Sequence, residues 1–184
     1  MHERSRIVQV TAHSLTDATN KMHEGRQGNQ QAIIVMVRQS ACTCCCCTLK
    51  FDVPTNFVVL EEDCGQSTGV MSAGAHWCYP CNKRVACMIT KDIVIFDAPV
   101  HRCPTRDNAY VDVDVSFTFR LPSIEAQVKT FVYKLGAARF DELLAAEVEE
   151  GIRNFVGTVW LSQVLDLRSE MAQSMIKELN KKFF

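Results

Sequence analysis

The 184-residue sequence has no long hydrophobic run. Its longest aliphatic stretch is Ile33–Val37, whereas a helix that spans a bilayer needs about 20 apolar residues. The polar N-terminus, Met1–Arg6, is not followed by the apolar core of a secretory signal. We therefore predict neither a transmembrane helix nor a signal peptide, and any attachment to a membrane must use other means.

The sequence also lacks an excess of basic charge, and it lacks recognisable catalytic motifs. It has 20 Lys and Arg against 21 Asp and Glu, and its largest local basic group is Lys181–Lys182. A protein that binds nucleic acid needs a basic face to neutralise phosphates. Neither a nucleophile elbow nor a phosphate-binding glycine loop is found. We expect no nucleic-acid partner, no small-molecule substrate, no cofactor and no catalytic residue.

Cysteine is abundant and unevenly placed. Of the ten cysteines, five fall within six residues: Cys42, Cys44, Cys45, Cys46 and Cys47. Adjacent cysteines cannot bridge one another without severe strain, because a disulfide requires a particular Cα separation and torsion. The other five are scattered, which is not typical of a secreted disulfide scaffold. A reducing, cytoplasmic-side location is the better interpretation.

The cysteine cluster is best interpreted as a set of S-acylation sites that tether a soluble domain to a membrane surface. Each acyl CH₂ buried in lipid contributes about 0.8 kcal/mol, and a single chain holds a protein only marginally. Two or more acylated cysteines would therefore be needed for stable attachment.

Other uses of the same thiols stay open. Cys44–Cys47 and the pair Cys78 and Cys81 could bind zinc, although consecutive cysteines are poor tetrahedral ligands. Cys78 and Cys81 could also form a redox pair, but such pairs need a helix N-terminus and a strand is predicted to follow. His76 and His101 could assist a cysteine nucleophile, yet nothing in the sequence brings them together. The alternative function is a soluble zinc- or redox-responsive cysteine module.

Composition divides the chain into three parts. Residues 1–41 predict a polar, mobile leader, and residues 42–50 form the cysteine-rich anchor segment. Residues 51–184 have the alternating and helical patterns of a folded domain.

Strand patterns occupy the first half of that domain. They are predicted at Asn56–Glu62, at Arg84–Phe96 and, most clearly, at Tyr110–Arg120, whereas Gly74–Trp77 is expected to be irregular. The last strand alternates strictly, with valine and phenylalanine on one face. Asp112 and Asp114 on its other face are explained as solvated residues or contacts to another subunit, rather than as a carboxylate pair.

Three helices are predicted after the strands. The first begins near Pro122 and ends at Gly136, and the second has an apolar stripe from Phe140 to Val159. Asp166 is the expected N-cap of the third, whose predicted core face is Met171, Met175, Ile176, Leu179 and Phe183. Strands followed by helices indicate an α+β fold, a mostly antiparallel twisted sheet packed against about three helices.

Four segments of this domain resemble the SPFH (stomatin/prohibitin/flotillin, or prohibitin-homology) family. The strand segment His101–Arg120 is similar to the family's signature strand, and Thr105–Asn108 matches the turn that leads into it. Phe131–Tyr133 and Leu143–Arg153 resemble its helical part, and Leu165–Arg168 resembles its link into the third helix.

The resemblance covers roughly residues 45–184, and it is nearest to the plant hypersensitive-induced reaction proteins. Those proteins carry paired cysteines directly before the first strand and a turn similar to Gly74–Cys81, which has one residue inserted here. Two departures are evident. His2 stands where those relatives have a glycine, so we expect no myristoylation, and Met36 is an alternative start. The chain stops where the family continues into a last strand and a coiled coil, which predicts a fragment.

The resemblance implies a function of the scaffold type. It predicts a non-catalytic protein that organises lipid and protein microdomains and self-associates into homo- or hetero-oligomers. Its partners would be membrane lipids and further subunits. The expected location is the cytoplasmic face of a membrane, either plasma or endosomal.

Overall fold

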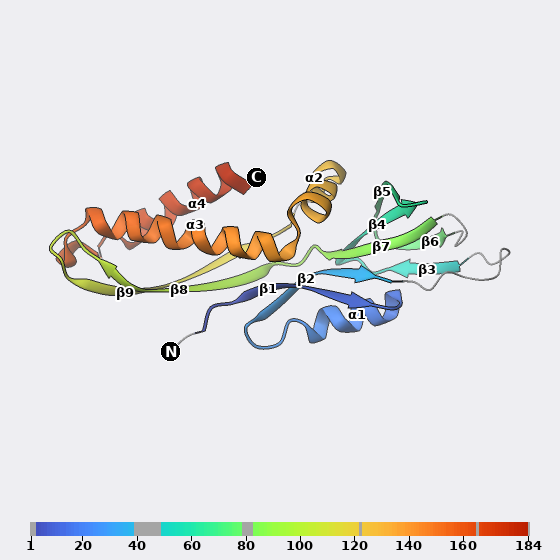
Figure 1. Ribbon diagram of the computed structural model, residues 1–184, viewed down its shortest axis with the longest axis horizontal. Helices are drawn as coiled ribbons and strands as arrows, with labels where there is room; N and C mark the ends of the chain where they lie inside the picture. The colour runs from blue at the N-terminus through green and yellow to red at the C-terminus, as the bar shows by residue number, and fades with distance from the viewer. Residues whose placement is uncertain (1–2, 39–48, 79–82, 122, 165, 184) are drawn as a thin grey trace. The chain divides into compact units, whose positions relative to one another are not determined.

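The computed structural model describes residues 3–38, 49–78, 83–121, 123–164 and 166–183 (Figure 1). Within these residues the strands are β1 (Arg6–Ala12), β2 (Gln30–Val37), β3 (Leu49–Val53), β4 (Phe57–Asp63), β5 (Gln66–Met71), β6 (Gly74–Cys78), β7 (Lys83–Thr90), β8 (Val94–Pro104) and β9 (Tyr110–Phe119). The helices are α1 (Leu15–Glu24), α2 (Glu125–Thr130), the π-helix η1 (Phe131–Leu135), α3 (Ala137–Thr158), the 3₁₀ turn η2 (Leu161–Gln163) and α4 (Arg168–Phe183).

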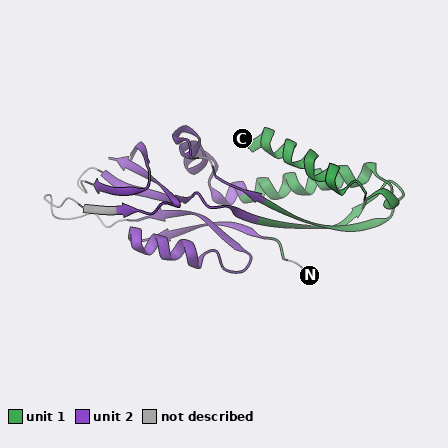
Figure 2. Cartoon of the chain, turned by 180° about the vertical axis from the view of Figure 1, so that it is seen from behind, with its two compact units in different colours: residues 1–4, 96–117, 141–184 green, residues 5–95, 118–140 purple. Residues whose placement is uncertain are grey.

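The chain divides into two compact units (Figure 2). Unit 1 comprises Met1–Arg4, Phe96–Phe117 and Asp141–Phe184, and unit 2 comprises Ser5–Ile95 and Thr118–Phe140. The described segments that flank the cysteine cluster in sequence, residues 5–38 and 49–78, both belong to unit 2.

Unit 2 is built on a five-stranded sheet of order β1-β2-β7-β4-β5. Strands β1 and β2 are parallel, and helix α1 connects them, because parallel neighbours need a crossover. The pairs β2–β7, β7–β4 and β4–β5 are antiparallel. Strands β3 and β6 form a separate antiparallel pair. The predicted α+β class with a mostly antiparallel sheet is confirmed.

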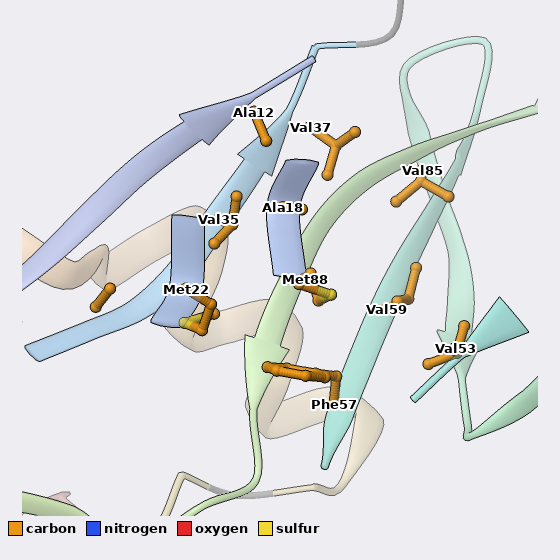
Figure 3. Close-up of a cluster of buried hydrophobic side chains, with 11 residues drawn as sticks. Ala12, Ala18, Met22, Val35, Val37, Val53, Phe57, Val59, Val85 and Met88 are labelled. Atoms are coloured by element: carbon orange, nitrogen blue, oxygen red, sulfur yellow. The ribbon is translucent and has the colours of Figure 1, made fainter. Parts of the chain in front are cut away.

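A well-packed apolar core lies between this sheet and α1 (Figure 3). Its buried members come from α1 and five strands: Ala12, Ala18, Met22, Ala32, Val35, Val37, Val53, Phe57, Val59, Val85 and Met88. Helix α1 faces this core, whereas α2 lies on the other side of the sheet (Figure 1). Helices therefore lie on both sides of the sheet within unit 2.

The expectation that residues 1–41 form a mobile leader is wrong for its described part. Residues 6–37 form a strand, a helix and a second strand. The Ser14 hydroxyl caps α1 by accepting a hydrogen bond from the Asp17 backbone N–H at 3.1 Å. Ala18 and Met22 on that helix are fully buried. The few apolar residues in this segment suffice because each is placed on a packed face, which overall composition does not reveal.

The other strand predictions have mixed outcomes. Asn56–Glu62 is confirmed as β4, and Tyr110–Arg120 is confirmed as β9, with exposure alternating along the strand as predicted. The Arg84–Phe96 run is split, since β7 ends at Thr90 and β8 begins at Val94. Gly74–Trp77 is not irregular, because pairing with β3 makes it part of β6.

The helix predictions are confirmed except for the buried face and the N-cap of the last helix. Helix α2 and η1 end at Gly136, which has a φ of 74°, and α3 buries its apolar stripe. On α4, however, Met175 alone of the five predicted core residues is buried, and Ile176 is 54% exposed. The α4 residues Met171, Met175 and Ile176 instead line an open groove within unit 1. Helix α4 starts at Arg168, so Asp166 is not its N-cap.

Replacing Met22 with alanine tests whether α1 belongs to the folded core. Met22 is fully buried, and truncating such a side chain leaves a cavity, so Met22→Ala should lower the free energy of unfolding by about 2–5 kcal/mol. The neighbouring His23→Ala, at an exposed site, should change it by less than about 0.5 kcal/mol. Urea denaturation followed by circular dichroism gives both values. Equal effects of the two variants would contradict the packing of α1.

Candidate functional site

The predicted acylation sites, Cys42 and Cys44–Cys47, lie outside the described residues. The chain on either side of them belongs to unit 2. Strand β2 ends at Val37, and the Arg38 N–H donates to the Ala12 carbonyl at 2.8 Å. After the cluster, β3 begins at Leu49, which is paired with Cys78 at the end of β6. The end of β2 and the start of β3 lie toward the same end of unit 2 (Figure 1).

Three cysteines outside the cluster are described, and all are free thiols. Cys64 is exposed in the β4–β5 turn, where it and Gly65 have φ values of 48° and 85°, as in a type I′ hairpin. Its hydrogen bond with Asp63 raises the pKa of the Cys64 thiol. Burial raises the pKa of Cys87 to about 12, and burial also raises the pKa of Cys103. Since the thiolate is the reactive form, all three are poor nucleophiles.

The other sequence-predicted groups are not brought together. His76 Nε2 lies 2.7 Å from the Ser72 carbonyl in unit 2, whereas His101 Nδ1 lies 3.7 Å from Asp112 in unit 1. Cys78 ends β6, and Cys81 lies outside the described residues. Across the described part of the chain, no cluster of three or more His, Cys, Asp or Glu residues has the arrangement of a metal site. The described helices include none that is long and apolar enough to cross a membrane.

A buried charged cluster lies at the end of β4, next to the strand ends that flank the cysteines. The side chains of Glu61 and Glu62 are each only 8% exposed. Glu61 Oε2 accepts from Lys83 Nζ at 3.2 Å and from the Thr68 hydroxyl at 3.0 Å. Glu62 Oε2 accepts from Arg84 Nε at 3.0 Å and from its Nη2 at 2.8 Å. Buried carboxylates need such partners, because an unpaired buried charge is very costly.

Tyr133 of η1 completes this cluster from the helical side. Its hydroxyl donates to Glu62 Oε1 at 2.6 Å. Burial and the bond to Glu62 raise the pKa of Tyr133 well above its ordinary value. Burial also acts to raise the pKa of Glu62, but the hydrogen bonds from Tyr133 and Arg84 and the Arg84 charge outweigh it, and the net shift is downward. Glu62 is therefore held as a carboxylate.

A polar pocket of about 440 Å³ opens beside Glu62. It crosses β1, β2, β7 and β4, and its lining residues are Gln9, Thr11, Met36, Val37, Arg38, Glu62, Arg84 and Ala86. Two of them, Arg38 and Arg84, carry guanidinium groups. The pocket therefore lies at the end of β2, directly before the cysteine-rich segment begins.

This charged cluster is not among the sequence-based predictions, although the sequence contains a signal for it. Glu61 and Glu62 stand at the end of the predicted strand Asn56–Glu62, where exposure is common. Lys83 and Arg84 stand at the start of the next long β-prone run. Opposite charges at the facing ends of two strands favour antiparallel pairing, and the structure pairs Glu62 with Arg84. The contribution of Tyr133 had no such signal, because Tyr133 lies 71 residues after Glu62 in the sequence.

Unit 1 holds the turn that the resemblance singled out. The Thr105 hydroxyl donates to Asp107 at 2.6 Å, which lowers the pKa of that carboxyl. Asp107 also accepts from the Leu161 N–H at 3.3 Å, and the Arg106 N–H donates to the Val159 carbonyl at 3.0 Å. The turn thus ties the β8–β9 hairpin to the segment after α3. Its polar residues have a structural explanation.

Replacing Tyr133 with phenylalanine removes one hydrogen bond to the Glu62 carboxylate. Near neutral pH, Tyr133→Phe should lower the free energy of unfolding by about 1.5 kcal/mol. Because the folded-state pKa of Glu62 lies below its ordinary value of 4.5, the difference should shrink as the pH falls below that value and the carboxylate becomes protonated. Tyr110→Phe is the matched control, since Tyr110 is 68% exposed. Urea denaturation at neutral pH and at pH values below 4.5 measures the effect of both substitutions on the free energy of unfolding. An effect of Tyr133→Phe that does not change with pH would contradict a hydrogen bond from Tyr133 to the Glu62 carboxylate.

A comparison with curated proteins found no match. In the comparison with protein families, the description that matches is SPFH domain / Band 7 family, and the match covers residues 51–184. It includes the Thr105–Asn108 turn, the alternating strand β9 and all the helices after it. Since the match extends over well more than half of the sequence, the chain belongs to the SPFH domain / Band 7 family.

Proposed function

We propose that this protein is a non-catalytic scaffold on the cytoplasmic face of a membrane, held there by S-acylation within Cys42 and Cys44–Cys47. Family membership carries this proposal, because the SPFH family is known for membrane-associated scaffolds and is generally non-catalytic. In this proposal the protein self-associates into homo- or hetero-oligomers and organises lipid and protein microdomains, at the plasma membrane or at endosomes.

The position of the cysteine cluster supports a tether close to the folded domain. Cys42 is the fourth residue after Arg38, whose backbone N–H is hydrogen-bonded to the Ala12 carbonyl. A fully extended chain covers at most about 3.6 Å per residue, so Cys42 is within about 14 Å of Arg38. Acyl chains in this segment would hold the adjacent end of unit 2 near the bilayer. Two or more chains would make the attachment stable.

Self-association would add to this attachment. Individually weak contacts between protomers and individually weak lipid anchors combine through multivalency, so an oligomer binds a membrane far more tightly than one protomer. We further propose that the chain is of the plant hypersensitive-induced reaction type. The cysteines ahead of β3 and the Gly74–Cys81 stretch, whose first part forms β6, support this assignment.

A zinc- or redox-responsive cysteine module is the second candidate. One observation favours it: Leu49, two residues after Cys47, is paired with Cys78 in the β3–β6 ladder. Leu49 and Lys50, at the end of the cysteine-rich segment, therefore lie at the same end of one ladder as Cys78. Zinc in stoichiometric amount in the purified protein would favour this function over acylation.

Changing all five clustered cysteines to serine tests the anchor. We expect the variant to move from the membrane pellet to the soluble fraction of cells, because its acyl chains are lost. The matched control is Cys64→Ser, which removes an exposed thiol outside the cluster and should leave the protein in the pellet. Acyl exchange that depends on hydroxylamine should label the parent protein and not the five-serine variant. Full retention of that variant in the pellet would refute attachment through this cluster.

A further inference from the structure

The pocket beside Arg38 has an excess of positive charge. Arg38 and Arg84 line it, and Glu62 is its one acidic lining residue. Glu62 is already engaged, since both its oxygens accept hydrogen bonds from Arg84 or Tyr133. An anion that enters the pocket therefore meets a carboxylate whose charge is largely compensated.

The donors that remain suit an oxyanion. Arg84 uses Nε and Nη2 on Glu62, and its side chain is still 63% exposed. Its Nη1 makes no hydrogen bond with a described residue, and neither does the exposed Arg38 guanidinium. Thr11 and Gln9 on β1 add a hydroxyl and an amide to the same wall. Guanidinium groups with neutral donors nearby match the geometry of a phosphate better than that of a metal ion or an apolar ligand.

We propose that this pocket binds the phosphate group of an anionic phospholipid, with Arg38 as the principal contact and Arg84 as the second. The proposal rests on the proposed function, because the anchor is what would bring the pocket to a bilayer. A soluble phosphate ester offers the same chemical group, but the location of the pocket favours the lipid.

The short distance along the chain between the pocket and the cysteine cluster favours a lipid as the source of the phosphate group. The pocket residue Arg38 is within about 14 Å of Cys42 along the chain, and exposed charges are screened over about 8–10 Å at physiological ionic strength. Because about 14 Å is the upper limit of that separation, acylation at Cys42 would allow Arg38 to come within the screening distance of the cytoplasmic leaflet, whose negative surface potential attracts basic side chains near the surface. Lipid phosphate would be present there at high local concentration, whereas a soluble ester would not.

Vesicle binding by a protein that cannot be acylated tests this inference separately from the anchor. The five-serine protein should cosediment with vesicles of phosphatidylcholine and phosphatidylserine more than with phosphatidylcholine alone. Arg38→Gln should lower its partition coefficient for the anionic vesicles by about fivefold, the effect of about one basic residue near a charged surface. Arg6→Gln is the matched control: it removes the same charge from an exposed position at the far end of β1, so its loss should be clearly smaller.

Three results would overturn the proposal. If Arg38→Gln and Arg6→Gln lower the partition coefficient for anionic vesicles equally, only the net charge of the protein determines vesicle binding. No preference for anionic vesicles would exclude the lipid. The third result combines two measurements. If the protein shows no preference for anionic vesicles, and glycerol 3-phosphate raises the melting temperature of the parent but not of Arg38→Gln, the pocket would be assigned to a soluble phosphate ester. The anchor is judged by fractionation in cells, so either proposal can fail while the other holds.

Discussion

The pairing of β4 with β7 is the constraint on which unit 2 depends. These strands are neighbours within the five-stranded sheet, and their register places Leu60 opposite Cys87 and Glu62 opposite Arg84. The same ladder therefore joins the apolar core to the charged cluster at its end. A shift of one residue would turn apolar side chains away from the core and leave buried carboxylates without cations. The register is thus specified by packing and by charge together.

Much of the domain after residue 51 could be predicted, because its signals are local. The alternation of β9 and the apolar stripe of α3 are read directly from spacing, and Gly136 marks a helix end through its own conformational freedom. The wrong predictions concern elements that depend on distant partners. Strand β6 exists because β3 pairs with it, and α1 is stabilised by a core that includes Phe57 and Met88.

The candidate site was predictable in a similar way. A cluster of adjacent cysteines is visible in any reading of the sequence, whereas the pocket beside it needs four strands to be placed side by side. Arg38 and Arg84 are 46 residues apart in sequence, and no local pattern connects them. The environment of Glu62 was hidden for a related reason, since one of its hydrogen-bond donors, Tyr133, follows 71 residues later in the sequence. Sequence patterns single out the cysteine cluster, whereas the pocket beside Arg38 is visible only in the tertiary structure.

The order of strands in the sheet has a consequence for synthesis. Strand β2 lies between β1 and the central strand β7, and β7 ends only at Thr90. Ribosomes add about 5–20 residues per second, so some 43 residues, or about 2–9 s of translation, separate Cys47 from the completion of β7. During that interval the cysteine-rich segment has already been synthesised, but the five-stranded sheet still lacks its central strand, β7. If the proposed acylation took place in that interval, the modifying enzyme would meet an unfinished domain, and attachment would precede completion of the sheet.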